Sequence, residues 1–138
     1  MMALLIAGAV LAAANLVRWY LDRSSRSDTE HFGGGVRLTR VWNTGAAFSL
    51  PLPQRAVEAL SLLALVFAWA GRKEHPTASG LVLGGGLANF HERVRHGRVY
   101  DYIQFPKAPG KAKRFVWNLA DFAILLGALG LAFGRKKR

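Results

Sequence analysis

One long apolar run limits what this chain can fold into more than any other feature. Residues 115–133 contain a single charged side chain, Asp121, and four cations follow at Arg135-Lys-Lys-Arg138. As a helix, this run would be about 28 Å long, close to the hydrocarbon thickness of a bilayer. A carboxyl group near the middle of such a helix is costly, so it normally faces a partner or a water-filled cavity. The run predicts a membrane helix with a functional site at Asp121, although a neutral or helix-capping carboxyl is the alternative.

Three further apolar stretches precede this run, at residues 1–17, 56–70 and 77–90. The last two would form helices of about 21–23 Å, which is marginal for crossing a membrane. Four such stretches in 138 residues, with 51% hydrophobic residues, favour a mainly α-helical membrane protein. We therefore expect a single domain over residues 1–138 with four transmembrane helices, at about residues 2–18, 55–70, 77–91 and 115–133.

The first stretch resembles a secretory signal in its small residues, but no Lys or Arg precedes it and it continues to Arg18. Net charge is +11, which is also typical of nucleic-acid binders. The cations cluster at the ends of the apolar runs, however, where anionic lipid accounts for them, so we expect no nucleic-acid partner. The dense cations of the 71–75 turn and of the C-terminal tail favour cytoplasmic termini.

Two segments between the apolar runs are rich in β-branched and aromatic residues. Residues 36–42 and 98–105 have this composition, and Gly33-Gly34-Gly35 precedes the first as a turn signal. The sequence therefore predicts a small extracytoplasmic β-sheet on the membrane surface. In the second segment, Asp101 shares one face with Val99 and Ile103, because side chains alternate along a strand.

Several kinds of chemistry are disfavoured. The chain has no cysteine, so it has no disulfide, thiol nucleophile or thiolate zinc site. His91 and His96 are five residues apart, about 140° around a helix, and cannot bind one metal from one face. Gly84-Gly85-Gly86 lacks the spacing of a nucleotide-binding loop and is better suited to close helix packing, together with Gly80. We expect no metal and no cofactor.

Carboxylates remain as the candidate chemistry, and Asp121 has one plausible partner. Asp101 lies twenty residues upstream, across a loop rich in Pro, Gly and Lys. If the strand returns over the mouth of the last helix, the two carboxyl groups converge. Two close carboxylates share a proton, so that one activates water as a base while the other donates to the scissile carbonyl. Such a pair can hydrolyse an amide without a metal.

Four blocks of sequence around these aspartates occur in a recognisable order. They are Asn43-Thr-Gly-Ala-Ala-Phe48, Asn89-Phe-His-Glu-Arg93, Gly97-Arg-Val-Tyr-Asp101 and Asn118-Leu-Ala-Asp121. The ordered set, in register with the apolar runs, resembles the prolipoprotein signal peptidases (signal peptidase II). The resemblance extends from about residue 36 to the C-terminus.

This resemblance implies an intramembrane aspartyl endopeptidase of the bacterial cytoplasmic (inner) membrane, with four spans and both termini in the cytoplasm. Its substrate would be a diacylglyceryl-modified prolipoprotein, cut just before the lipidated cysteine. The resemblance also implies inhibition by globomycin and no cofactor, and we expect a monomer in contact with membrane lipid. Asp101 and Asp121 match the catalytic pair. The supporting or substrate-binding positions are Asn43, Gly45, Asn89, Arg93 and Asn118.

Spacing is consistent with these roles. Asn118 precedes Asp121 by three residues, and Asn89 precedes Arg93 by four, so each pair shares a helix face. A helix or turn cap is the alternative role for each asparagine. Aromatic residues suited to line the mouth of the site at the membrane interface are Trp42, Phe48, Tyr100, Tyr102 and Trp117.

The chain departs from the family pattern at three places. The first apolar run lacks the usual Asp and has Arg18 for Lys, and the usual Gly-Asn and Asp-Arg pairs read Ala88-Asn89 and Glu92-Arg93. A catalytically impaired or non-enzymatic four-span protein of the same fold is therefore the alternative.

Overall fold

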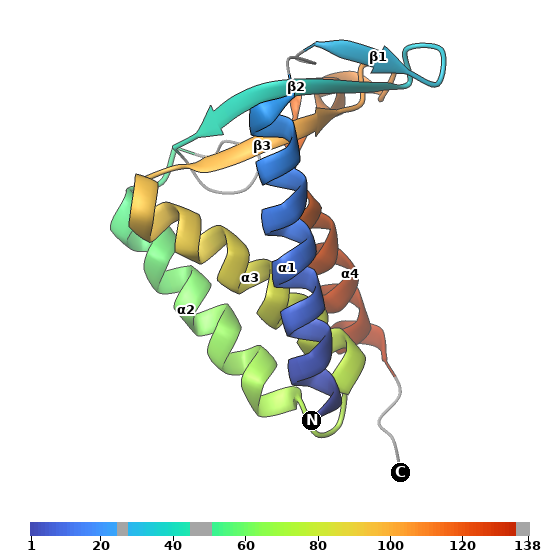
Figure 1. Ribbon diagram of the computed structural model, residues 1–138. Coiled ribbons are helices and arrows are strands. Elements are labelled where there is room, and N and C mark those ends of the chain that lie inside the picture. The colour runs from blue at the N-terminus through green and yellow to red at the C-terminus, as the bar shows by residue number, and fades with distance from the viewer. Residues whose placement is uncertain (25–27, 45–50, 135–138) are drawn as a thin grey trace.

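The computed structural model describes residues 1–24, 28–44 and 51–134. Four α-helices form a bundle, and a four-stranded sheet lies across one end of it (Figure 1). The helices are α1 (Met2–Arg23), α2 (Gln54–Gly71), α3 (Pro76–His96) and α4 (Leu119–Phe133). The start of α1, the α2–α3 turn and the last turn of α4 all lie at the end opposite the sheet (Figure 1). The prediction of a mainly helical protein with a small β-sheet is confirmed.

α1 and α3 continue past the apolar segments that predicted them. We expected helices ending near residues 18 and 91, and they end at Arg23 and His96. Their last turns carry charged side chains, so the hydropathy pattern did not include these turns in the predicted helices, although they are helical. α3 stops where Gly97 takes a left-handed conformation, with φ of 69°, a common way to end a helix.

α4 begins four residues later than the apolar run suggested. Residues 116–117 form strand β4 (Val116–Trp117), and Asn118 is the N-cap of the helix. The side chain of Asn118 accepts a hydrogen bond from the Asp121 N–H, and Asp121 accepts one from the Asn118 N–H, which makes a capping box. Asp121 therefore lies in the first turn of α4, and the expectation of a carboxyl group near the middle of a membrane helix was wrong.

Glycines allow α3 to pack closely against its neighbours. A Cβ atom at Gly84 would lie 2.6 Å from the Ala7 carbonyl oxygen of α1, and one at Gly85 would lie 2.5 Å from the Ala120 carbonyl oxygen of α4. Gly80 approaches α1 in the same way. These contacts match the use of small residues between membrane helices. The sequence interpretation of this glycine group as a packing feature is confirmed.

This packing predicts a large difference between two glycine-to-alanine substitutions. Gly84→Ala pushes a methyl group into the α1 backbone, and overpacking of this kind typically costs about 1–3 kcal/mol. Gly8→Ala on α1 is the matched control, because a Cβ there meets nothing within 4 Å. We expect a lower thermal midpoint for purified Gly84→Ala and an unchanged or higher one for Gly8→Ala. Equal midpoints would contradict the close α1–α3 contact.

The sheet is antiparallel, with strand order β1-β2-β3-β4. Its first three strands are β1 (Thr29–His31), β2 (Val36–Asn43) and β3 (Val99–Gln104). β2 and β3 correspond to the two segments predicted to be extended. Val41 pairs with Asp101 and Asn43 with Val99, so the end of β2 lies beside the start of β3. A short 3₁₀ helix (Gly110–Arg114) precedes β4.

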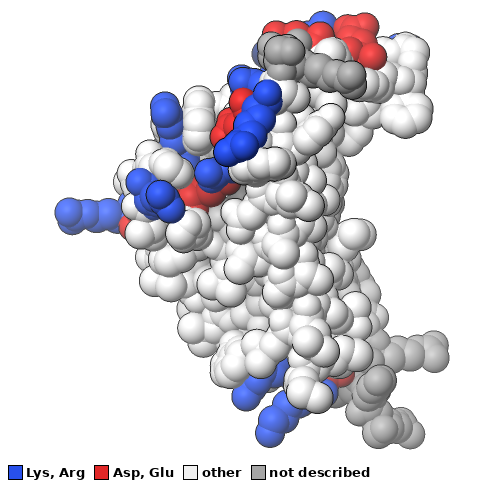
Figure 2. Space-filling model, in the orientation of Figure 1, with Lys and Arg blue, Asp and Glu red and all other residues white. Residues whose placement is uncertain are grey.

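The bundle exposes apolar side chains rather than hiding them. α1 and α2 are long and apolar enough to cross a membrane, yet only 11% of each apolar window is buried inside the structure. α4 is shorter and also apolar. Lys and Arg gather at the sheet end and at the opposite end, with a wide uncharged band between them (Figure 2). Such a band is what a lipid environment would cover.

Candidate active site

Asp101 and Asp121 come from different elements and meet where the sheet joins the bundle. Asp101 lies on β3, between two buried tyrosines, and is 4% exposed. Asp121 lies in the first turn of α4. The short β4 strand pairs with β3 at Ile103 and Gln104 and so places the start of α4 beside β3. The return of the chain over the last helix, expected from the sequence, is present.

Asn118 connects the two carboxyl groups. Its side-chain Nδ2 donates to Asp101 Oδ1 at 2.9 Å, while its backbone N–H donates to Asp121 Oδ2 at 2.9 Å. Its Oδ1 accepts from the Asp121 backbone N–H at 2.9 Å. Asn118 is 5% exposed. The residue is thus both the helix cap that the sequence analysis gave as an alternative and a link between the two aspartates.

α3 contributes two further side chains from one face. Asn89 Nδ2 donates to Asp121 Oδ1 at 2.9 Å, and Asn89 Oδ1 accepts from Asn118 Nδ2 at 3.0 Å. Arg93, one turn later, is 6% exposed, and its positive charge acts on both Asp101 and Asp121. The arginine therefore offsets part of the negative charge that two buried carboxyl groups would bring.

The surroundings of Asp101 bring the pKa of its carboxyl group close to neutrality. Its pKa is raised from 3.8 to about 7, first by burial and next by the neighbouring charge of Asp121. Hydrogen bonds from Asn43 and Asn118, and the charge of Arg93, act in the opposite direction. A carboxyl group with a pKa near neutrality can both hold and release a proton under physiological conditions, as general acid–base chemistry requires.

A cavity of about 400 Å³ opens beside the two aspartates. Its polar end contains Asn43, Asn89, Arg93, Asp101 and Asp121. The rest of its wall is mostly apolar and comes from α2, α3 and α4; examples are Leu60, Leu65, Val82, Ile124 and Leu125. An apolar cleft with a few convergent polar groups is the usual form of a substrate site. This one suits a ligand that presents a polar bond at one end and apolar groups along the rest.

Six of the seven residues proposed from the sequence gather at this site; the seventh, Gly45, lies outside the described residues, as does Phe48.

The aromatic residues predicted to line the mouth of the site fall into two groups. Trp117 lines the cavity and Trp42 is 40% exposed, but Tyr100 and Tyr102 are only 2% and 4% exposed. The two tyrosines pack around Leu21 as part of the core, so placing them at the mouth was wrong.

Glu92 was not proposed as a site residue and Tyr102 was expected only at the mouth, yet both support the site. The Tyr102 hydroxyl oxygen accepts from the Leu119 N–H at 3.0 Å, and Glu92 contacts both α1 and β3. Because side chains alternate along β3, Tyr102 lies on the face opposite Asp101. Its hydrogen bond with the Leu119 N–H is visible only in the tertiary structure. Among the described residues, no three His, Cys, Asp or Glu side chains gather as a metal site.

Comparison with known proteins decides the family. A family model described as signal peptidase (SPase) II matches residues 5–134. The chain belongs to the signal peptidase II family. This is a family of aspartic peptidases, and the resemblance seen in the sequence motifs is confirmed.

Curated relatives of this signal peptidase II chain cover most of its length. It is 35% identical over 117 residues to a lipoprotein signal peptidase from Syntrophomonas wolfei, an alignment covering 80% of this chain and 72% of that one. It is 34% identical over 141 aligned positions to a lipoprotein signal peptidase from Serratia marcescens, covering 90% and 78%.

The fold also matches a solved bacterial membrane enzyme, determined by the in meso method at 2.3 Å. The TM-score is 0.79 at 19% identity, over 99% of this chain and 93% of the other. The likeness shows that the two proteins share the bundle-and-sheet fold.

Proposed function

We propose that this protein is an intramembrane aspartyl endopeptidase that removes the signal peptide from diacylglyceryl-modified prolipoproteins, just before the lipidated cysteine. Asp101 and Asp121 are its catalytic pair. One observation carries the assignment of the residues: in a chain of the signal peptidase II family, the two aspartates are joined through Asn118 at the polar end of an apolar cavity.

The two carboxyl groups have different surroundings, which suggests a division of roles. Both oxygens of Asp121 accept hydrogen bonds from N–H donors, and the residue lies where the α4 dipole favours negative charge. Asp121 is then the carboxylate that takes a proton from the attacking water. Asp101, with its pKa of about 7, holds the shared proton and donates it to the scissile carbonyl oxygen. Arg93 and Asn43 line the same cavity and can bind peptide carbonyls.

The membrane arrangement follows from the ends of the bundle. All four helices cross the membrane, with spans near residues 2–18, 55–70, 77–91 and 119–133, in a single domain. The α2–α3 turn carries Arg72 and Lys73 at the end opposite the sheet (Figure 1), and the positive-inside bias supports a cytoplasmic position for that end and for both termini. The active site then faces the outer side of the bacterial cytoplasmic membrane, and the monomer holds a complete site.

A reconstituted cleavage assay tests this function. Purified protein in detergent should convert a diacylglyceryl-modified prolipoprotein into the mature lipoprotein and a free signal peptide. Globomycin should block the reaction, whereas EDTA and thiol alkylation should leave it intact. A folded protein that leaves the lipidated substrate uncut would instead support the non-enzymatic alternative.

The raised pKa of Asp101 predicts a fall in activity at high pH. Below about pH 7 Asp101 keeps the proton that the reaction needs; above it the proton is lost, so kcat/KM should fall about tenfold per pH unit. The hydrogen bond from Asn43 lowers the pKa of Asp101. Because Asn43→Ala removes this bond, the fall in kcat/KM should move to higher pH in that variant. The measurement is a profile of kcat/KM from pH 5 to 9. A flat profile in this range would refute acid catalysis by Asp101.

A further inference from the structure

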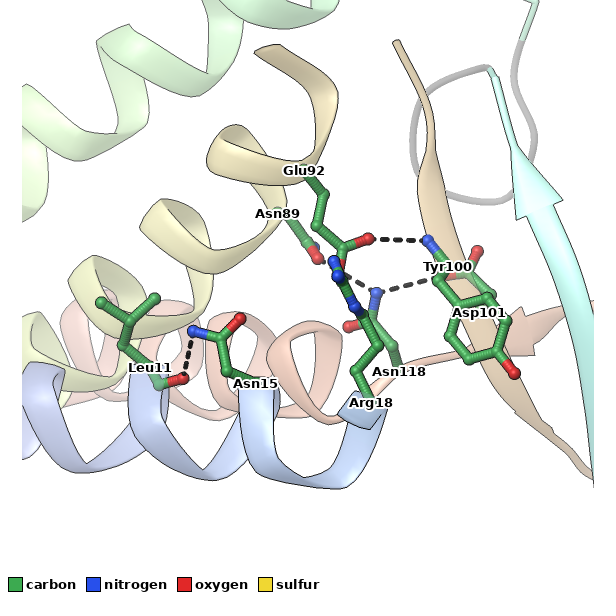
Figure 3. Close-up of polar contacts among 8 residues, drawn as sticks. All are labelled: Leu11, Asn15, Arg18, Asn89, Glu92, Tyr100, Asp101 and Asn118. Atoms are coloured by element: carbon green, nitrogen blue, oxygen red, sulfur yellow. Dashed lines mark hydrogen bonds and ion pairs between the residues drawn. The ribbon is translucent and has the colours of Figure 1, made fainter. Parts of the chain in front are cut away.

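Glu92 lies on the α1 side of the site and has a different partner on each carboxylate oxygen. Oε1 accepts from Arg18 Nη1 of α1 at 3.0 Å, and Oε2 accepts from the backbone N–H of Tyr100 on β3 at 2.9 Å. Figure 3 shows Glu92 reaching from α3 toward Tyr100, with Arg18 rising from α1 beside it. A single side chain thus joins α1, α3 and β3.

These contacts are largely shielded from solvent. The side chain of Glu92 is 12% exposed and that of Arg18 is 28% exposed. A shielded carboxylate without a partner is strongly destabilising, and the Arg18 guanidinium is the charged partner of Glu92. Hydrogen bonds to an ionised acceptor are also stronger than those between neutral groups. The Glu92–Tyr100 bond is therefore a firm anchor for the β3 backbone.

The anchor acts where no strand of the described residues pairs with that edge of β3. β4 pairs with β3 only at Ile103 and Gln104, whereas Tyr100 lies at the other end of the strand. Tyr100 is 2% exposed, so its N–H group would be buried without an acceptor if Glu92 were absent. Glu92 supplies the acceptor that a neighbouring strand would otherwise provide.

The consequence falls on the next residue in the chain, Asp101. Its hydrogen bond to Asn118 requires β3 to hold its position against α4. α3 thereby acts on both carboxyl groups: Asn89 donates to Asp121, and Glu92, three residues later, fixes the backbone beside Asp101. We propose that Glu92, paired with Arg18, is a positioning residue that holds Asp101 in its reactive geometry. This inference rests on the proposed peptidase function.

The first test is Glu92→Gln, which keeps the shape of the side chain and removes its charge. Its amide can accept from one partner only and turns N–H donors toward the other. Displacement of a catalytic group by about 1 Å can cost about 100-fold in rate, so we expect kcat to fall about 10- to 100-fold. KM for the lipidated prolipoprotein should change less than about twofold, because Glu92 does not line the large cavity. Glu30→Gln, which loses an exposed ion pair with Arg37, is the matched control and should keep full kcat.

A charge-swapped pair separates positioning from simple stabilisation. Arg18→Glu combined with Glu92→Arg restores an ion pair between α1 and α3, but an arginine cannot accept the Tyr100 N–H. The thermal midpoint of the swapped pair should lie closer to that of the wild type than the midpoint of Glu92→Gln does, while kcat of the swapped pair stays low. If Glu92→Gln does not fold, the swapped pair carries the same test.

Recovery of kcat in the swapped pair, or wild-type kcat in Glu92→Gln, would overturn the inference and leave the proposed function standing. Absence of cleavage by the wild-type protein would instead overturn the proposed function, and the inference with it.

Discussion

Asp101→Asn and Asp121→Asn should each lower the cleavage rate of a lipidated prolipoprotein by at least about 100-fold. Each carboxyl group transfers a proton in the proposed reaction, and a positioned acid or base typically contributes about 10²–10⁴-fold. An asparagine keeps the shape and can occupy similar hydrogen bonds, but it can neither take up nor release the proton. The measurement is single-turnover cleavage by purified variants, so that slow binding or release does not mask the chemical step.

Both variants should remain folded, and Asp101→Asn should resist heating at pH 8 at least as well as the wild type. The raised pKa of Asp101 means that the folded state binds a proton that the unfolded state has lost, so this group lowers stability as the pH rises from about 4 through 7. A neutral asparagine removes that loss. Asp28→Asn is the control, because Asp28 is exposed with φ of 59°, a conformation that asparagine also adopts. A wild-type rate in either dyad variant would refute the aspartyl assignment.

A precursor whose cysteine carries no diacylglyceryl group should be cut at least about 100-fold more slowly than the lipidated form. The cavity beside the aspartates is walled mainly by apolar side chains of α2, α3 and α4, so it can accommodate apolar parts of the substrate next to the scissile bond. Each buried CH₂ group contributes roughly 0.8 kcal/mol, and a few such groups already exceed a 100-fold effect.

The lipid comparison needs two substrates of identical sequence, one lipidated and one not, assayed as kcat/KM in the same detergent. A third substrate with serine in place of the cysteine controls for the thiol. Equal kcat/KM for the lipidated and unlipidated forms would contradict lipid-dependent recognition and favour a general signal peptidase.

The sequence predicted those features whose cause is local or periodic. Apolar runs placed the four helices, because each helix buries or exposes a continuous apolar surface along its length. Asp101 and Asp121 could be paired from sequence because the loop between them allows a return, and the ordered motifs then indicated the family. The glycines of α3 were interpreted as packing positions from their spacing and composition.

The start of α4 could not be predicted from hydropathy. Val116 and Trp117 are as apolar as a helix requires, but they pair with β3, and the Asn118–Asp121 capping box then fixes the first turn. A capping signal inside an apolar run competes with the run itself, and in this chain the cap and the strand pairing decide where the helix begins.

Residues whose roles depend on packing between elements were also missed. Tyr100 and Tyr102 have the amphipathic character of interfacial residues, yet the core around Leu21 buries them. Glu92 was noted only as a departure from the family pattern, because its contacts with Arg18 and Tyr100 join segments 74 and 8 residues away. No periodic pattern encodes such distant contacts.

Identification of the bond that is cut tests the proposed peptidase function most directly. Purified wild-type protein and Asp121→Asn are incubated with one diacylglyceryl-modified prolipoprotein, and both product ends are measured by mass spectrometry. We expect a signal peptide that ends just before the lipidated cysteine with the wild-type protein, and intact precursor with Asp121→Asn. Cleavage at any other bond, or the same products from Asp121→Asn, would contradict the proposed function.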